Sequence, residues 1–227
     1  MKKSVIKLFG LLAVTGLAFT SCSRGDDDDD VVTPPTTSFV ANPNDFKGNI
    51  NDGEVILDAT KTYKLTGLLQ VNSGATLTIP AGTIIEGTNG TASYIAVAQG
   101  GKINVNGTAD NPVVMTSGKA TKAPGDWGGL VICGKAPINT SATVGGTASA
   151  EVSDLTYGGS NSADNSGIIK YLRIEYTGYA YSATKEFNGV SLFGVGAGTT
   201  FEYVQAYKSG DDGIEFFGGS VNAKYLI

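Results

Sequence analysis

The sequence contains no histidine among its 227 residues. Histidine is the most common general base in enzymes and the most common metal ligand, so a Ser-His-Asp triad built within this chain is excluded. Cysteine is also scarce: Cys22 and Cys133 are the two present, and they could form one disulfide at most. These two absences remove much of the usual chemistry of active sites.

Basic residues are in the minority, with 16 against 21 acidic residues and a formal net charge of −5. Residues 1–21 contain three of the lysines and no acidic residue, so the chain without them carries a net charge of −8. A surface with this balance repels phosphate backbones. Nucleic acid is therefore not an expected partner.

A hydrophobic run long enough to cross a membrane as a helix is also missing. Residues 8–19 form an uncharged, mainly apolar run behind a basic start, which is the length of a signal-peptide core. Two small residues and then Cys22 follow, and they resemble the lipobox of bacterial lipoproteins, although Phe19 stands where that motif usually has leucine. The resemblance implies that residues 1–21 are a lipoprotein signal peptide and that Cys22 is lipidated. The alternative is an ordinary signal peptide with a chance cysteine.

Residues 22–48 are expected to be a tether. Five consecutive aspartates at positions 26–30 cannot be buried together, and the Pro/Thr-rich stretch that follows prolongs an extended chain. An acidic run just after the lipidated cysteine also resembles the surface-export signal of Bacteroidota-type lipoproteins. It implies an outer-membrane lipid anchor with the protein exposed at the cell surface. Ca²⁺ binding by the run is disfavoured because a flexible segment lacks fixed geometry.

From residue 49 onward, short apolar runs recur and are stopped by Gly, Asn, Asp or Pro. No 3.6-residue periodicity lasts long enough for a substantial helix, and the β-branched content favours strands. Cys133 stands in one such run, where a buried core position is expected rather than a reactive thiol. Residues 49–227 are thus expected to form an all-β domain.

Internal repeats indicate which all-β architecture the domain has. Residues 170–178 align with residues 202–210, and the start of the motif returns at residue 224; a second series aligns residues 188–194 with 212–218. Repeats of roughly 20 to 30 residues with several short strands are typical of a solenoid. The sequence therefore predicts a right-handed, single-stranded parallel β-helix. A β-sandwich or a propeller blade is the alternative, although the chain has few hairpin signals.

The repeat also predicts which side chains stack. Leu172, Val204 and Leu226 are expected to point inward, with Ile174 and Ala206 forming the next layer. The tyrosines one residue before the first three, at positions 171, 203 and 225, are then expected to stack outward. Residues 178–186 are the expected loop that lengthens one coil.

Three stretches of the sequence resemble those of a known family. The stretches 71–83, 107–117 and 125–132 resemble successive coils of Bacteroidota cell-surface lipoproteins with pectin-lyase-like β-helices, most of which have no assigned activity. Relatives continue for further coils, so the chain is expected to be a C-terminally truncated portion. The resemblance covers about residues 50–227.

The pectin-lyase-like fold hosts uronate lyases and polygalacturonases, which use clustered carboxylates. Asp211 and Asp212 resemble the paired aspartates of polygalacturonases and are the candidates for acid–base catalysis or for Ca²⁺ binding. The histidine-containing element of those enzymes is absent. The competing interpretation is that Gly210 to Gly213 simply form the turn between two coils.

Aromatic side chains are the candidates for stacking on sugar rings. They are Trp127, Tyr176, Tyr179 and Tyr181. Each could instead pack against the solenoid, and Trp127 with its flanking glycines is the strongest case for a packing role.

Three functions remain open at this point. The first is a non-enzymatic surface module for adhesion or for binding a polysaccharide or host glycan, without a cofactor. The second is a polysaccharide lyase or glycoside hydrolase that uses Asp211 and Asp212. The third is a structural protein of the cell envelope.

Overall fold

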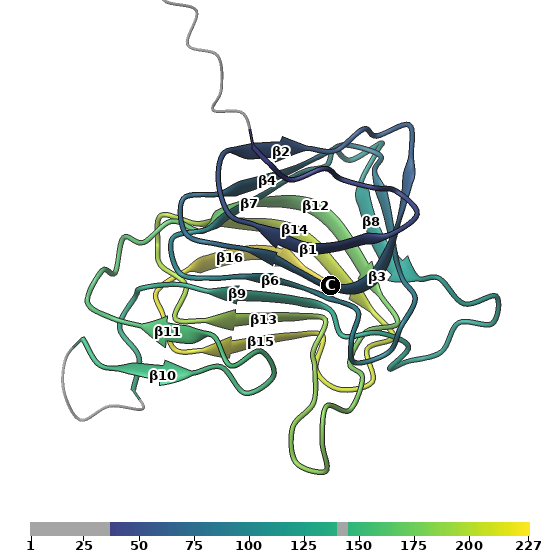
Figure 1. The fold of residues 1–227 in the computed structure, drawn as a ribbon. Coiled ribbons are helices and arrows are strands. Elements are labelled where there is room, and N and C mark those ends of the chain that lie inside the picture. Colours follow the sequence, from purple (N-terminus) through teal and green to yellow (C-terminus); the bar gives the residue numbers. More distant parts are fainter. Residues whose placement is uncertain (1–36, 140–144) are drawn as a thin grey trace, which may run out of the picture. The chain divides into compact units, whose positions relative to one another are not determined.

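The computed structural model describes residues 37–139 and 145–227. Fourteen of its strands form one continuous parallel sheet that coils around a core (Figure 1). The predicted all-β parallel β-helix is therefore confirmed. The expected signal peptide, Cys22 and the aspartate run lie outside the described residues. Within residues 37–139 and 145–227, no helix could cross a membrane.

The pairing divides each turn of the solenoid into three faces, here called A, B and C. Two long strands bend from face A to face B, and one bends from face B to face C. Face A contains β2 (Glu54–Ile56), β4 (Thr76–Pro80), β7 (Lys102–Asn106), the first halves of β12 (Gly167–Glu175) and β14 (Thr200–Tyr207), and β16 (Asn222–Leu226).

Faces B and C complete each turn. Face B contains the first half of β3 (Thr62–Val71), β5 (Ile84–Gly87), β8 (Val113–Ser117) and the second halves of β12 and β14. Face C contains β1 (Phe46–Ile50), the second half of β3, β6 (Tyr94–Val97), β9 (Leu130–Cys133), β13 (Val190–Phe193) and β15 (Ile214–Phe217).

The strand register follows the sequence repeats. Leu172 pairs with Val204, and Val204 pairs with Leu226, while Ile174 pairs with Ala206. Residues 190–193 pair with 214–217, as the second repeat predicts. Leu172, Ile174 and Val204 are buried in the interior. The inward stack inferred from the repeats is therefore correct for these three residues, whereas Leu226, on the last strand described, is 38% exposed.

The predicted outward tyrosine stack is also present. The ring centroids of Tyr171 and Tyr203 lie 4.4 Å apart, and those of Tyr203 and Tyr225 lie 4.4 Å apart, with nearly parallel planes in both pairs. All three residues have positive φ, between 50° and 58°. This left-handed conformation bends the strand from face A to face B in one residue, and its cost of roughly 1 kcal/mol per residue is offset by ring stacking.

The coil below the tyrosines turns the same corner differently, through residues 107–112. A Cβ atom on Gly107 would lie 2.3 Å from the carbonyl oxygen of Tyr171. Only glycine fits this close approach of two backbones. Gly107 therefore lets the tyrosine stack begin directly above a loop.

The first coil begins earlier than residue 49, the start expected from the sequence. Strand β1 starts at Phe46, so residues 46–48 of the expected tether belong to the sheet. Phe39 lies against Phe46, with 6.4 Å between ring centroids, and packs on the core. Apolar residues before the first strand thus cover the N-terminal end of the core.

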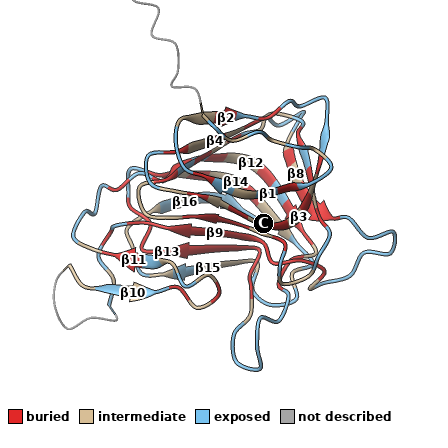
Figure 2. Cartoon of the chain, in the orientation of Figure 1, coloured by how far each residue is buried: buried red, intermediate tan, exposed pale blue. Residues whose placement is uncertain are grey.

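An insertion after β9 covers the outside of face C. Residues 145–165 include the antiparallel pair β10 (Thr147–Ser149) and β11 (Thr156–Gly158). Ala150, Val152 and Tyr157 from this insertion form a second apolar cluster with Val131, Cys133 and Phe193 of the sheet. Strands β9 and β13 are consequently buried on both sides (Figure 2). No repeat or motif in the sequence predicts this insertion.

Candidate functional site

Asp211 and Asp212 lie in the turn between β14 and β15, and both are exposed. The turn is bonded to the coil below it: the Gly210 N–H donates to the Thr177 carbonyl at 2.8 Å, and the Gly189 N–H donates to the Asp212 carbonyl at 2.9 Å. The backbone of this segment therefore forms a turn, as in the competing interpretation of the motif, but the turn joins face B to face C within one coil and does not join two coils.

Further carboxylates surround this turn. Burial raises the pKa of Glu215, and the charges of Asp212 and Asp211 act in the same direction, while a hydrogen bond from the Asn188 amide at 2.6 Å opposes them. Burial and the charge of Glu215 also raise the pKa of Glu151. Even so, no three His, Cys, Asp or Glu side chains of the described residues are grouped so that they could hold a metal ion.

Trp127 is fully buried and has a packing role. Its indole N–H donates to the Glu175 carbonyl at 2.8 Å, and its ring lies on the backbone of Gly87 in the coil below. A Cβ atom on Gly87 would lie 2.5 Å from Cγ of the indole. The glycine that makes room for Trp127 is therefore one coil away, not beside it in the sequence. Its ring is not available to a ligand in this structure.

Tyr179 and Tyr181 lie on the loop after β12 and are 38% and 42% exposed. The Tyr181 ring packs edge-on against Phe187, with centroids 5.7 Å apart, and Phe187 in turn contacts Tyr94 at 4.8 Å. The loop is fastened by Tyr179, whose N–H donates to the Trp127 carbonyl at 3.3 Å. Both tyrosines are therefore partly exposed, and the Tyr181 ring also takes part in the packing.

Tyr176 is separated from these two and lies at the corner after face B. It has a φ of 58°, and the equivalent residue one coil later, Lys208, has a φ of 53°. The ring of Tyr176 meets the ring of Tyr207 edge to face, with centroids 5.9 Å apart. Tyr207 is 38% exposed. Two rings from successive coils thus form an open aromatic corner.

Three cationic groups surround this pair of rings. Lys122 Nζ and Lys208 Nζ lie 5.8 and 5.9 Å from the centroid of Tyr176. Lys208 Nζ and Arg173 Cζ lie 5.3 and 5.8 Å from the centroid of Tyr207. We refer to Lys122, Arg173, Tyr176, Tyr207 and Lys208 as the basic–aromatic patch. Its charge is opposite to that of the protein as a whole.

The charge of the patch is only partly compensated. Arg173 is ion-paired with Glu175, whose other oxygen accepts a hydrogen bond from Thr116 at 2.8 Å. Lys122 donates to the hydroxyl of Thr116 at 3.1 Å. Glu175 is buried beneath these groups. One carboxylate therefore faces three cations, and the patch carries an excess of positive charge.

The loop that carries Lys122 is held in place by a buried carboxylate. Asp126 accepts hydrogen bonds from Lys119 at 2.8 Å, from Ser117 at 2.6 Å and from the Ala123 N–H at 2.9 Å. Although burial opposes it, these bonds hold the pKa of Asp126 below its ordinary value. The Asp126 N–H also donates to the Tyr176 carbonyl at 2.9 Å. Lys122 is thereby positioned beside the ring of Tyr176.

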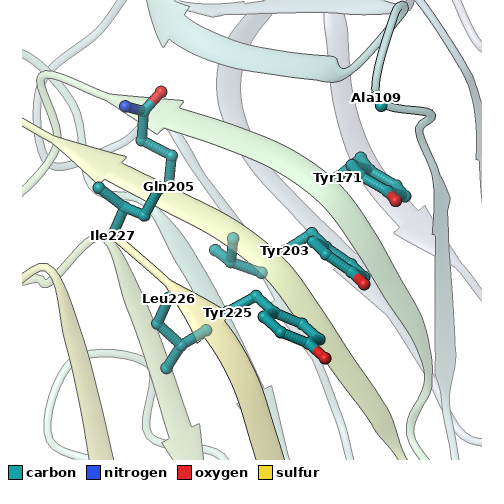
Figure 3. A pocket seen from close by; sticks show the side chains of 8 residues that line it. Ala109, Tyr171, Tyr203, Gln205, Tyr225, Leu226 and Ile227 are labelled. Carbon is teal, nitrogen blue, oxygen red and sulfur yellow. The ribbon is translucent and has the colours of Figure 1, made fainter.

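A hollow of about 600 Å³ lies beside the tyrosine stack at the face A–face B corner. Figure 3 shows the rings of Tyr171, Tyr203 and Tyr225 one above another, with their hydroxyl groups on the same side. The remaining lining is mainly aliphatic and includes the amide of Gln205. This hollow has no charged side chain, in contrast to the basic–aromatic patch.

Two members of the patch could have been found from the sequence. The alignment of residues 170–178 with 202–210 places Tyr207 beside Glu175 and Lys208 beside Tyr176, and the structure has this register. Lys122 belongs to a loop outside the repeat, so its proximity to Tyr176 has no counterpart in the sequence pattern.

Residues 48–227 match the family model described as the pectate-lyase-like β-helix domain. The comparisons with curated proteins and with solved structures gave no match.

Proposed function

Since the chain belongs to the family of pectate-lyase-like β-helix domains, we propose that it is a non-enzymatic carbohydrate-binding module that contacts its glycan through the basic–aromatic patch. By this proposal, a lipid on Cys22 anchors the protein in the outer membrane, and the solenoid presents the patch at the cell surface. Two acyl chains or more give stable anchoring, whereas one chain binds only marginally.

The aromatic corner is the observation that supports this proposal. Tyrosine rings offer apolar faces to the C–H faces of sugars, while nearby cations and hydroxyl groups offer hydrogen bonds to sugar oxygens. Tyr176 and Tyr207 belong to successive coils of a hydrogen-bonded solenoid, so their relative position is fixed before a ligand arrives. A preorganised pair of rings lowers the entropic cost of binding.

A glycan panel tests the proposal. The purified chain is passed over immobilised neutral and acidic polysaccharides, and both retention and the release of new reducing ends or unsaturated uronates are measured. We expect retention without cleavage, and we expect Y176A and Y207A each to weaken it by about tenfold, which corresponds to about 1.4 kcal/mol. The matched control is Y181A, which removes a similarly exposed tyrosine outside the patch.

The outcomes of this panel separate the candidate functions. Cleavage that is abolished in D211N/D212N would instead establish a lyase or hydrolase. Absence of retention on every polysaccharide would favour a structural role in the envelope. Equal losses in Y176A and Y181A would show that the patch is not the binding surface.

The anchor is tested separately. In cells that express the full chain, C22S should move the protein from the membrane fraction to the soluble fraction, and labelling with a radioactive fatty acid should disappear. Unchanged fractionation of C22S would reject lipidation at this residue without affecting the proposal about glycans.

A further inference from the structure

The basic–aromatic patch has a charge and a donor geometry that suit one kind of glycan more than others. Three cationic groups approach the same pair of rings from different residues: Lys122 from a loop, Arg173 from β12 and Lys208 from the corner after β14. All three are exposed. Such an arrangement can surround an anionic substituent, whereas a neutral sugar would leave these charges unused.

The geometry of the donors distinguishes between anions. A carboxylate is planar and is recognised best by a free guanidinium fork, which offers two parallel N–H groups. Only part of the Arg173 guanidinium is free for a ligand, because its Nε is ion-paired with Glu175 and the outer Nη groups alone remain. A sulfate ester presents three terminal oxygens in different directions, so it can accept hydrogen bonds from separate donors around it. The patch supplies separate donors, two of which are ammonium groups.

The two lysines are also not neutralised by the protein. In the described part of the chain, the ion pairs involve other lysines or Arg173, and none involves Lys122 or Lys208. Lys122 instead makes a hydrogen bond to a neutral hydroxyl, that of Thr116. Their charges therefore remain available to a ligand.

Building on the proposed binding function, we infer that the glycan is a sulfated polysaccharide. A sulfate ester lies between Lys122, Lys208 and the outer N–H groups of Arg173, while the sugar ring that bears it packs on Tyr176 or Tyr207. The acidic turn residues Asp211 and Asp212, three and four positions after Lys208, border the patch along the chain and disfavour a ligand with charge on that side.

The experiment measures how tightly the full chain binds three polymers, which are dextran sulfate, dextran and polygalacturonate. We expect dextran sulfate to bind at least about tenfold more tightly than polygalacturonate, and dextran to bind weakest of all. K122Q/K208Q should weaken binding to dextran sulfate by about tenfold, because it removes two of the donors. Binding should also weaken as salt is raised.

The matched control is K47Q/K61Q, which changes the net charge by the same amount on the first coils. Lys47 and Lys61 are exposed and are paired with Asp45 and Asp58. This variant should bind dextran sulfate within about twofold of the original chain. Melting curves check that both double variants are folded, which is expected because all four lysines are at the surface.

Two results would overturn the inference while leaving the binding function in place. One is polygalacturonate binding as tight as dextran sulfate binding, and the other is an equal loss of affinity in the two double variants. Retention of no polymer, charged or neutral, would reject the proposed function together with the inference.

Discussion

The outer surfaces of faces B and C are built on the same strand alternation but have opposite characters. On face C, the outward positions of β9 and β13 include Val131, Cys133 and Phe193, and the insertion after β9 covers them. On face B, the outward positions of β12 and β14 include Arg173 and Tyr207, which are exposed. The contrast shows that one solenoid can use one side for stability and leave another for contact.

The difference follows from the side chains that the coils direct outward. Apolar outward residues lower the free energy when a second layer covers them, by about 25 cal/mol for each Å² of apolar surface. Charged and aromatic residues at the same kind of position can stay solvated. The covered side of face C therefore behaves as an additional core, and the patch behaves as a surface. Four predictions test how sharp this distinction is.

The reactivity of Cys133 gives the largest expected effect. Burial raises the pKa of this thiol to about 12, and the side chain is fully covered. In a C22S chain, in which Cys133 is the remaining thiol, alkylation at pH 8 should be at least about a hundredfold slower than for an exposed cysteine, because thiolate is scarce and access is blocked. Mass spectrometry of the alkylated protein measures the rate. Fast labelling of the folded chain would show that the cover over face C opens readily.

The second prediction concerns the energy of the covered side. Phe193 is buried, stacks on Phe217 at 4.0 Å and contacts Tyr157 at 5.0 Å. F193A should lower the free energy of unfolding by about 3 kcal/mol or more, since it leaves a cavity in the second apolar cluster. Urea denaturation measures it. F216A, at a phenylalanine that is 46% exposed, is the control and should cost less than half as much. A loss in F193A no greater than that in the control would mean that the insertion adds little stability.

The sequence pattern predicts the periodic part of this fold but does not predict the layer that covers face C. The repeats at positions 171, 203 and 225 gave the register and the outward tyrosine stack, because identical positions in successive coils must satisfy the same packing. The insertion has no repeat, and its apolar residues Ala150 and Val152 are too few to signal a second cluster. Their burial depends on contacts with strands distant in the sequence.

Only part of the candidate site could be predicted from the sequence, because one of its residues lies on a loop outside the repeats. Tyr176 was a candidate, and the repeat places Lys208 at the equivalent position one coil later. The proximity of Lys122 arises from hydrogen bonds of Asp126 that fasten a non-repeating loop. The packing role favoured for Trp127 is confirmed by its burial, but the space for its ring comes from Gly87 in another coil and not from the glycines beside it in the sequence.

The third prediction addresses the open side. Y207A should lower the free energy of unfolding by less than about 1 kcal/mol, because the ring is partly exposed and its removal leaves no closed cavity. The same variant should lose about tenfold in glycan binding. Urea denaturation and retention on the glycan panel are measured on one preparation. A stability loss as large as that of F193A would contradict the distinction between faces B and C, since the patch would then stabilise the fold as much as the covered side does.

The smallest expected effect is at the border of the covered side, where Glu215 lies on the outward side of β15 beside Asn188. Burial and the nearby carboxylates raise the pKa of Glu215 in the folded chain above its ordinary value. The folded state therefore holds its proton to higher pH than the unfolded state does. It follows that the free energy of unfolding falls as the pH rises from the ordinary pKa to the raised one, and that the full penalty is present at neutral pH.

E215Q removes this penalty while keeping an oxygen that accepts the Asn188 hydrogen bond. It should raise the free energy of unfolding at pH 7 by a few tenths of a kcal/mol, a small value because solvent screens the site, and the gain should vanish below about pH 4. E202Q is the control of opposite sign, since Glu202 is paired with Lys170 at 3.4 Å and Lys224 at 3.9 Å. Urea denaturation from pH 3 to pH 8 measures both. If E215Q instead lowered the free energy of unfolding at pH 7, the charged Glu215 carboxylate would stabilise the folded chain. The outward side of β15 would then belong with the solvated surface and not with the covered side of face C.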